Sequence, residues 1–149
     1  MKISTMLSYA GGFEESVDEV VRLEKEGLDT VWVAEAWGFD APSLMGYLAA
    51  RTQRVQIASG ILPLYSRTPS LLAMTAAGVD ALSGGRAMLG LGASGPQVIE
   101  GWHGVPYDAP VTRLREIIEV CRKIWRRERL VHSGRKYQMP LPEGQGTGL

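Results

Sequence analysis

Short apolar runs alternate with longer amphipathic stretches along this chain of 149 residues. The apolar runs predict four strands, at residues 3–8, 30–34, 55–59 and 87–91. The amphipathic stretches, with apolar residues three or four positions apart, predict helices at residues 14–26, 41–51, 69–82 and 110–127. Two short runs on either side of Ser133 and Gly134 predict a hairpin within residues 130–139. Strands that alternate with helices indicate a parallel sheet, and strands that are apolar on both sides fit a sheet covered on both faces.

Residue types at the ends of the predicted helices support these boundaries. Asp40 and Thr68 precede two of the helices and can cap them with a side-chain oxygen. Asp108 lies where the longest helix starts. Gly27 ends the first helix, and the glycine pair at residues 84–85 ends the third.

Two architectures are compatible with this alternation, an open doubly wound sheet and a closed barrel. Residues 90–95 read Gly-Leu-Gly-Ala-Ser-Gly, which is the spacing of a dinucleotide fingerprint, and Glu116 follows at a plausible distance for a ribose contact. However, this segment follows the fourth strand, Pro96 comes directly after its last glycine, and Glu116 falls inside a predicted helix. We therefore favour a Gly-rich loop of an α/β barrel, in which the four βα units would form half of the eight.

Composition narrows the class of protein further. Lys plus Arg and Asp plus Glu number 16 each, so no net charge attracts the chain to nucleic acid or to an anionic membrane. The single cysteine, Cys121, excludes an internal disulfide and falls on an apolar helix face, where a buried thiol is expected. Because the sequence has no metal-ligand spacing, no run of 18 apolar residues and no recognisable signal peptide, we expect a cytoplasmic protein without a metal.

Four segments of the chain resemble one known family. They read Val-Trp-Val-Ala-Glu-Ala-Trp at 31–37, Thr-Gln-Arg-Val-Gln-Ile-Ala-Ser-Gly at 52–60, Asp-Ala-Leu-Ser-Gly-Gly-Arg at 80–86 before a strand that ends at Gly92, and Ser-Gly-Pro-Gln-Val-Ile-Glu-Gly-Trp at 94–102. Together they resemble the luciferase-like monooxygenase superfamily, and the last segment resembles its branch that uses the deazaflavin coenzyme F420. The resemblance implies a (β/α)8 TIM barrel of which residues 1–149 are the N-terminal half, with the C-terminal half absent. It also implies a homodimer.

Barrel enzymes carry their active sites at the carboxyl ends of the strands, where the βα loops converge. In this chain those ends are residues 8–9, 35–37, 60–62 and 92–96, which are mostly small and let a flat ring system approach the main chain. The resemblance implies a cofactor site at Glu35, Ala36, Ser59, Gly60, Ile61, Gly92, Ala93, Ser94 and Gly95. The pair Gly60–Ile61 matches the family's bulge behind the cofactor ring, where a non-proline cis peptide occurs, and an ordinary strand end is the alternative.

Two residues are candidates for catalysis. Glu35 is the one acid in an apolar neighbourhood at such a strand end, and burial would raise its pKa and suit it to proton transfer. Alternatively, Glu35 caps the next helix or pairs with an arginine. His103 follows the fourth loop, where a loop histidine with satisfied hydrogen bonds is the alternative. Related sugar-phosphate dehydrogenases carry Asp-His where this chain has Glu35-Ala36, which puts their acid–base chemistry and their substrate in doubt here.

For three further aromatic side chains the sequence predicts only whether they are buried, exposed or near a pocket. Trp37 and Trp102 either line a substrate pocket or belong to the core. His132, in the predicted hairpin, is expected to be exposed.

The reaction that the resemblance implies is hydride transfer between coenzyme F420 and a small organic substrate. Reduced flavin mononucleotide (FMN) with oxygen, as in the luciferases, is the alternative cofactor, and a truncated half-barrel without catalytic activity is a second alternative. We expect the four strands in the order 1-2-3-4 in one curved parallel sheet. Its unpaired edge strands and bare inner face predict that the isolated chain associates with itself.

Overall fold

The computed structural model describes residues 1–7 and 12–145. In chain order the elements are β1 (Ser4–Leu7), α1 (Phe13–Glu26), β2 (Thr30–Val33), α2 (Ala41–Arg51), β3 (Gln56–Ser59), β4 (Leu62–Pro63), α3 (Pro69–Ser83), β5 (Ala87–Met88), β6 (Leu91–Gly92), a π-helix η1 (Gln97–Trp102), α4 (Pro110–Trp125), β7 (Val131–Ser133) and β8 (Gln138–Pro140). The chain divides into two compact units, one formed by Met1–Leu62 with Gly78–Leu91 and the other by Pro63–Ala77 with Gly92–Leu149. Each helix within the described residues is too short or too polar to cross a membrane.

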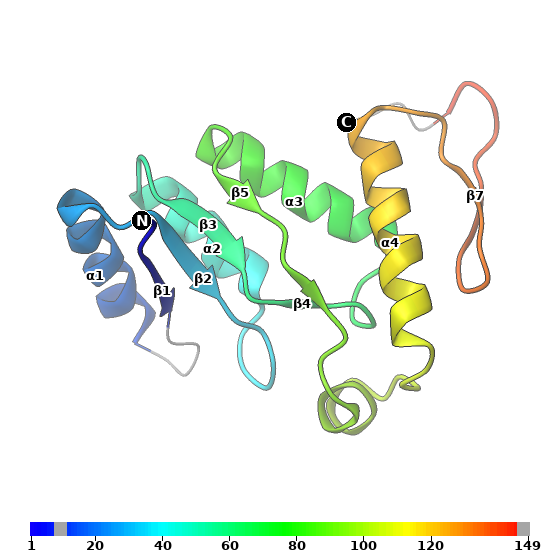
Figure 1. Ribbon diagram of the computed structural model, residues 1–149, viewed down its shortest axis with the longest axis horizontal. Helices are drawn as coiled ribbons and strands as arrows, with labels where there is room; N and C mark the ends of the chain where they lie inside the picture. Colours follow the sequence, from blue (N-terminus) through cyan, green and yellow to red (C-terminus); the bar gives the residue numbers. More distant parts are fainter. Residues whose placement is uncertain (8–11, 146–149) are drawn as a thin grey trace. The chain divides into compact units, whose positions relative to one another are not determined.

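The first unit is built on a parallel sheet with the strand order β1-β2-β3-β5 (Figure 1). The predicted order of the four strands is thereby confirmed. A dinucleotide-binding fold has its first strand inside the sheet, whereas β1 is an edge strand here. The structure therefore excludes the dinucleotide interpretation of residues 90–95.

The two faces of this sheet differ in what covers them. Side chains alternate between the faces along a strand, and Val31 and Ile57, which are register partners, lie fully buried on one face. α2 packs against β2 and β3 and also contacts α1, and Figure 1 shows α2 behind these strands. The opposite face carries the register row of Met6, Trp32 and Met88, in which both methionines are exposed.

The helix ends of this unit follow the local signals in the sequence. α2 has the predicted bounds, and the Asp40 carboxylate caps it by accepting a hydrogen bond from Ser43 N at 3.0 Å. Gly27 closes α1 with a φ of 107°, in the left-handed region that glycine tolerates. α1 begins at Phe13, one residue before the predicted start.

The fourth predicted strand is interrupted, which corrects the expectation of a continuous strand at residues 87–91. The structure has β5 and β6 instead, and β6 pairs with β4 in a separate two-stranded ladder. At the interruption, the hydroxyl of Ser59 binds the backbone N–H and C=O of Gly90.

The second unit contains α4, which packs on the first part of α3. The Trp125 indole Nε1 donates to the Ala73 carbonyl at 3.1 Å, and the Cys121 Sγ lies 3.6 Å from the Pro69 carbonyl oxygen. Cys121 is buried as predicted, and burial raises the pKa of its thiol to about 11.

α4 begins at Pro110, as predicted, and ends at Trp125, close to the predicted end. Asp108 does not cap the helix, because Ala109 takes the N-cap position with a φ of 44°. The Asp108 carboxylate instead forms ion pairs with Arg113, at 2.6 Å, and with Lys136. The π-helix η1 was not predicted, because six residues are too few for a recognisable apolar period.

The predicted hairpin is present, but its histidine is not exposed. β7 (Figure 1) pairs antiparallel with β8. In this pairing His132 lies opposite Met139. His132 is buried, with its Nε2 atom 3.6 Å from Glu116 Oε2 and its Nδ1 atom 3.8 Å from Glu119 Oε2. The expectation of an exposed His132 is therefore wrong, because the hairpin docks against α4.

Glu116 holds the turn of this hairpin on α4. Its carboxylate is buried and accepts hydrogen bonds from the backbone N–H groups of Arg135, Lys136 and Tyr137, at 2.8, 3.0 and 2.9 Å. Desolvation acts to raise the pKa of Glu116, but these three donors outweigh it, so the pKa lies below its usual range. Glu116 is thus a structural anchor.

Candidate active site

Two groups of predicted site residues lie at adjacent strand ends in the first unit. Glu35 and Ala36 follow β2, whereas Ser59 ends β3 and leads into Gly60 and Ile61. Val33 and Ser59 are register partners, and Gly60 N donates to the Val33 carbonyl at 2.7 Å. The sequence therefore predicted correctly that these two segments come together at one edge of the sheet. The predicted end of the first strand, at residues 8–9, lies outside the described residues.

The Gly60–Ile61 peptide bond is cis, as the sequence predicted. A Cβ built on Gly60 would lie 3.4 Å from the Trp32 ring, so this ring packs against the main chain on that face of the sheet. Gly60 and Ile61 are both partly exposed. The main chain at this point is consequently accessible to a ligand.

Glu35 contacts the start of the next helix. Its Oε2 atom accepts a hydrogen bond from Ala41 N, the first residue of α2, at 2.8 Å. This contact matches the alternative in which the carboxylate caps a helix, where the helix dipole also favours a negative charge. Glu35 as a residue is partly exposed.

The remaining predicted cofactor residues, Gly92 to Gly95, belong to the second unit. The Gly92 carbonyl accepts from Leu64 N at 3.0 Å, and the Gly95 carbonyl accepts from the first turn of η1. Ser94 has a φ of 56°, and its carbonyl faces the Tyr107 hydroxyl at 3.4 Å. Ala93 is partly exposed between them.

Sequence reasoning missed a cluster that supports this Gly-rich loop. The Arg113 guanidinium lies 5.1 Å from the ring centre of Tyr65 and 5.7 Å from that of Tyr137. Tyr65 stacks on Tyr107 with ring centres 5.2 Å apart, and Tyr107 is the residue that faces Ser94. Local patterns gave no signal, because the members come from separate loops, α4 and the hairpin.

His103, the second catalytic candidate, directly follows η1 in the second unit. Its backbone N–H donates to the Val98 carbonyl at 3.0 Å. Its Nε2 atom is buried and has no hydrogen-bond partner among the described residues. Both expectations for His103, a catalytic role and a loop histidine with satisfied hydrogen bonds, stay predictions.

Trp37 and Trp102 are not core residues. Trp37 is 49% exposed and Trp102 is 59% exposed. Of the two expectations for these rings, burial in the core is wrong, and a role in lining a substrate pocket stays a prediction.

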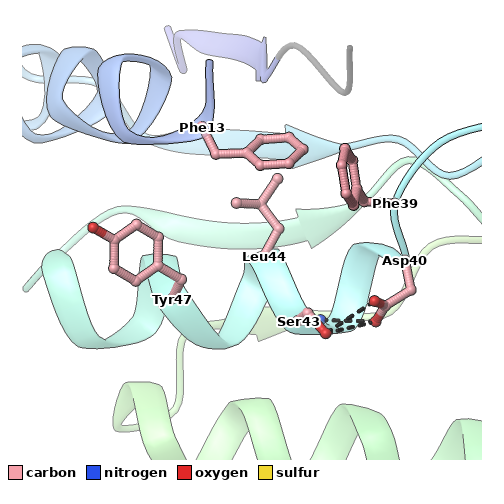
Figure 2. Close-up of a pocket in the computed structure, with 6 residues that line it drawn as sticks. All are labelled: Phe13, Phe39, Asp40, Ser43, Leu44 and Tyr47. Carbon is pink, nitrogen blue, oxygen red and sulfur yellow. Dashed lines mark hydrogen bonds between the residues drawn. The ribbon is translucent and has the colours of Figure 1, made fainter. Parts of the chain in front are cut away.

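A pocket of about 420 Å³ lies at the start of α1 and along α2 (Figure 2). Its walls are Phe13, Phe39, Leu44 and Tyr47, with Asp40 and Ser43 at one end. The Phe13 and Phe39 rings meet edge to face, with centres 4.9 Å apart. The pocket contains none of the predicted site residues, so it is separate from the strand-end segments.

Comparison with solved structures defines the fold. The coenzyme F420-dependent tetrahydromethanopterin reductase of Methanopyrus kandleri matches with a TM-score of 0.86 at 20% identity, over 94% of this chain and 44% of that one. The FMN-bound oxygenating constituent of 3,6-diketocamphane monooxygenase from Pseudomonas putida matches with a TM-score of 0.81 at 20% identity, over 96% of this chain and 45% of that one. The chain thus has an α/β fold with a parallel sheet that covers part of a TIM barrel.

The family follows from the sequence as a whole. The family described as luciferase-like monooxygenase matches residues 1–147. This chain belongs to the luciferase-like monooxygenase family.

Individual relatives cover the chain well but extend beyond it. A protein of Mycobacterium tuberculosis named "Putative coenzyme F420-dependent oxidoreductase" is 44% identical over 100% of this chain and 44% of its own length. The F420-dependent glucose-6-phosphate dehydrogenase of Amycolatopsis mediterranei is 32% identical over 86% of this chain and 42% of its own length. The chain therefore spans less than half the length of these relatives.

Proposed function

We propose that this chain carries part of an oxidoreductase that transfers a hydride between coenzyme F420 and a small organic substrate. The observation that carries the proposal is the 44% identity, over the whole chain, to a relative from Mycobacterium tuberculosis whose name gives F420 dependence. In this proposal, residues 1–149 supply the first four βα units of one barrel domain, and the working enzyme is a homodimer in the cytoplasm.

The strand ends of the first unit fit a flat ring system by their size. Ala36 and Gly60 are small, and Ala36, Gly60 and Ile61 are all partly exposed, so a planar ligand can reach the main chain. Coenzyme F420 supplies the hydride chemistry when it is bound. The protein contributes binding and orientation, for which we assign the main chain at Gly60 and the Glu35 carboxylate.

Catalytic proton transfer in this proposal falls to Glu35 or His103. Glu35 follows β2 at the strand end and is partly exposed as a residue, and His103 directly follows η1. Because Ala36 offers no imidazole beside Glu35, the substrate is proposed to differ from glucose 6-phosphate. Gly92 to Gly95 are assigned to the cofactor site as a main-chain loop.

A direct titration distinguishes the two cofactors. Purified protein is added to F420 and, separately, to FMN, and quenching of the cofactor's own fluorescence is recorded. We expect saturable quenching of F420 at a dissociation constant at least tenfold below that for FMN, with urea-unfolded protein as the control. A result in which neither cofactor is quenched contradicts the proposed function.

Reduced FMN with oxygen is the second candidate, because the family description itself names a monooxygenase. In the same titration, tighter binding of FMN than of F420 supports this alternative. Formation of the oxygenated product from reduced FMN, oxygen and a ketone or aldehyde substrate, compared with a reaction without protein, then provides the independent check.

A further inference from the structure

The backbone ladder between β3 and β5 stops at the pair Ala58–Met88. Beyond it, Gly60 N donates to Val33 on the other neighbouring strand, away from β5. Backbone pairing toward the fourth strand resumes only where Leu62 N donates to the Gly90 carbonyl at 2.9 Å. The sheet therefore has an interval, between Ser59 and Leu62, without a backbone ladder on this side.

The Ser59 hydroxyl fills this interval. It accepts a hydrogen bond from Gly90 N at 2.8 Å and donates one to the Gly90 carbonyl at 2.9 Å. Ser59 is fully buried, so water cannot take over these bonds if the hydroxyl is removed. The approach is close enough to require glycine, because a Cβ on Gly90 would lie 2.0 Å from the Ser59 carbonyl oxygen.

The Ser59 side chain points away from the accessible face of Gly60. By alternation along β3, Ser59 shares the buried, helix-covered face with Ile57, whereas Ala58 lies in the row of Trp32 on the other face. Trp32 is the residue that a Cβ on Gly60 would meet. A ligand on the Trp32 side of the main chain therefore has no access to the Ser59 hydroxyl.

We propose that Ser59 is a positioning residue for the cofactor site and does not contact the cofactor itself. Its hydroxyl acts through Gly90 to fix the main chain of Gly60 and Ile61, against which the ring would bind. This inference rests on the proposed function. It assigns to Ser59 a different role from Glu35, Ala36 and Gly60, which we place in contact with the ligand.

The test compares two serine-to-alanine variants. Ser59→Ala removes the bridge to Gly90. Ser83→Ala is the matched control, because the buried Ser83 hydroxyl also links two backbone groups, donating to Asp80 O and accepting from Arg86 N, each at 3.2 Å. Hydrogen exchange of the Gly90 amide by NMR and the dissociation constant for F420 are measured on each variant, together with the melting temperature.

For Ser59→Ala we expect Gly90 exchange to quicken and F420 binding to weaken, each roughly fivefold to tenfold. For Ser83→Ala we expect a comparable fall in melting temperature with an unchanged dissociation constant. Ser59→Cys, which keeps the shape with a weak donor and acceptor, replaces Ser59→Ala if that variant does not fold.

Two results would overturn the inference. Weakened F420 binding with unchanged Gly90 exchange would mean that Ser59 touches the cofactor directly. Faster Gly90 exchange with unchanged F420 binding would make the bridge purely structural. A wild-type protein that binds neither F420 nor FMN contradicts the proposed function and the cofactor part of this inference, while Gly90 exchange still decides whether Ser59 holds the strand.

Discussion

At the scale of single residues, Glu35 combines a contact with α2 and a position at the candidate site. Glu35→Gln keeps an oxygen that can accept from Ala41 N but removes the charge. We expect F420 binding or turnover to weaken about tenfold, as for the loss of a charge-assisted hydrogen bond, with little change in melting temperature. Fluorescence titration and steady-state kinetics measure the effect.

Asp40→Asn is the matched control for Glu35→Gln. Asp40 caps the same helix through Ser43 N, but we place it outside the cofactor site. A loss of F420 binding as large in Asp40→Asn as in Glu35→Gln would show that both carboxylates act only by stabilising α2.

Removal of the Glu116 carboxylate should lower the stability of the folded protein. Glu116→Ala leaves the N–H groups of Arg135, Lys136 and Tyr137 without their acceptor, so we expect roughly 2–4 kcal/mol less free energy of unfolding. Chemical denaturation at pH 7 measures it. Glu119→Ala, at an exposed position of the same helix, should change stability by less than about 1 kcal/mol. Equal losses in the two variants would contradict the anchoring role.

The same anchor predicts a pH dependence. The pKa of Glu116 is lower in the folded protein than in the unfolded chain, so the charged form is favoured by folding. The charge of Glu116 therefore contributes fully to the free energy of unfolding above the ordinary glutamate pKa of about 4.3. This contribution is lost as the pH falls through the lower pKa of the folded protein. The stability gap between wild type and Glu116→Gln should shrink over that acidic window.

Residue-level inference from sequence succeeded where the signal was local or carried by a family motif. The burial of Cys121 follows from helical periodicity, and the cis bond before Ile61 follows from the resemblance. The burial of His132 could not be predicted, because it depends on Glu116 and α4, which no pattern near the hairpin reveals. The partner of Glu35 stayed open for a related reason, since either capping or pairing fits an acid at that place.

At the scale of elements, helix ends were predictable to within a few residues. Asp40 and Gly27 act on neighbouring backbone groups, so the adjacent sequence is enough to predict where these helices begin or end. The break between β5 and β6 was not predictable, since it depends on Ser59, a residue of another strand. The ion pair of Asp108 was not predictable for the same reason, because its partner Lys136 belongs to the hairpin.

Arg86 connects α2, α3 and the loop before β3, so its substitution should lower the stability of the first unit strongly. Its guanidinium donates to the carbonyls of Ser83, Val55, Ala49 and Thr52, and to the Thr52 hydroxyl, at 2.6 to 3.2 Å. A lysine keeps the charge but cannot reproduce this planar fork. Arg86→Lys should therefore lower the free energy of unfolding by roughly 2–4 kcal/mol, whereas Arg22→Lys, at an exposed site on α1, should be neutral. Thermal and chemical denaturation of both variants provide the check.

At the scale of the whole molecule, the exposed face of the sheet in the first unit predicts self-association. Met6 is 61% exposed and Met88 is 37% exposed in the row that contains Trp32, and β1 and β5 are edge strands. Exposed apolar faces and unpaired edges both favour contact with another copy of the chain. Light scattering of the 149-residue chain should give a mass above the monomer that rises with concentration.

Lysine substitutions locate the contact. Met6→Lys and Met88→Lys introduce charge on this face and should shift the chain toward monomer. Met74→Lys, at an exposed methionine on α3, should leave the association unchanged. A monomeric wild-type chain over the whole concentration range would contradict the prediction.

Whole-molecule inference depended on two kinds of signal. Alternation of strands and helices predicted a parallel sheet but left the choice between an open sheet and a barrel. Four family segments, together with Pro96 after the Gly-rich loop, favoured the barrel correctly. The division of the chain into two compact units could not be read from the sequence, because two of its boundaries fall inside α3 and β6 and not in a linker.

Cys121, the single cysteine of the chain, can report how often the packing of α4 on α3 opens, because its thiol is buried there. With a pKa of about 11 and 1% exposure, Cys121 offers almost no reactive thiolate to an alkylating reagent while α4 stays docked. The rate of single-site labelling at neutral pH should therefore follow how often this packing is released, and it should rise with urea in parallel with unfolding. Mass spectrometry after timed iodoacetamide pulses measures this rate without any engineered probe. Complete labelling within seconds in the absence of urea would contradict this expectation, because it would show that α4 detaches from α3 frequently in the folded protein.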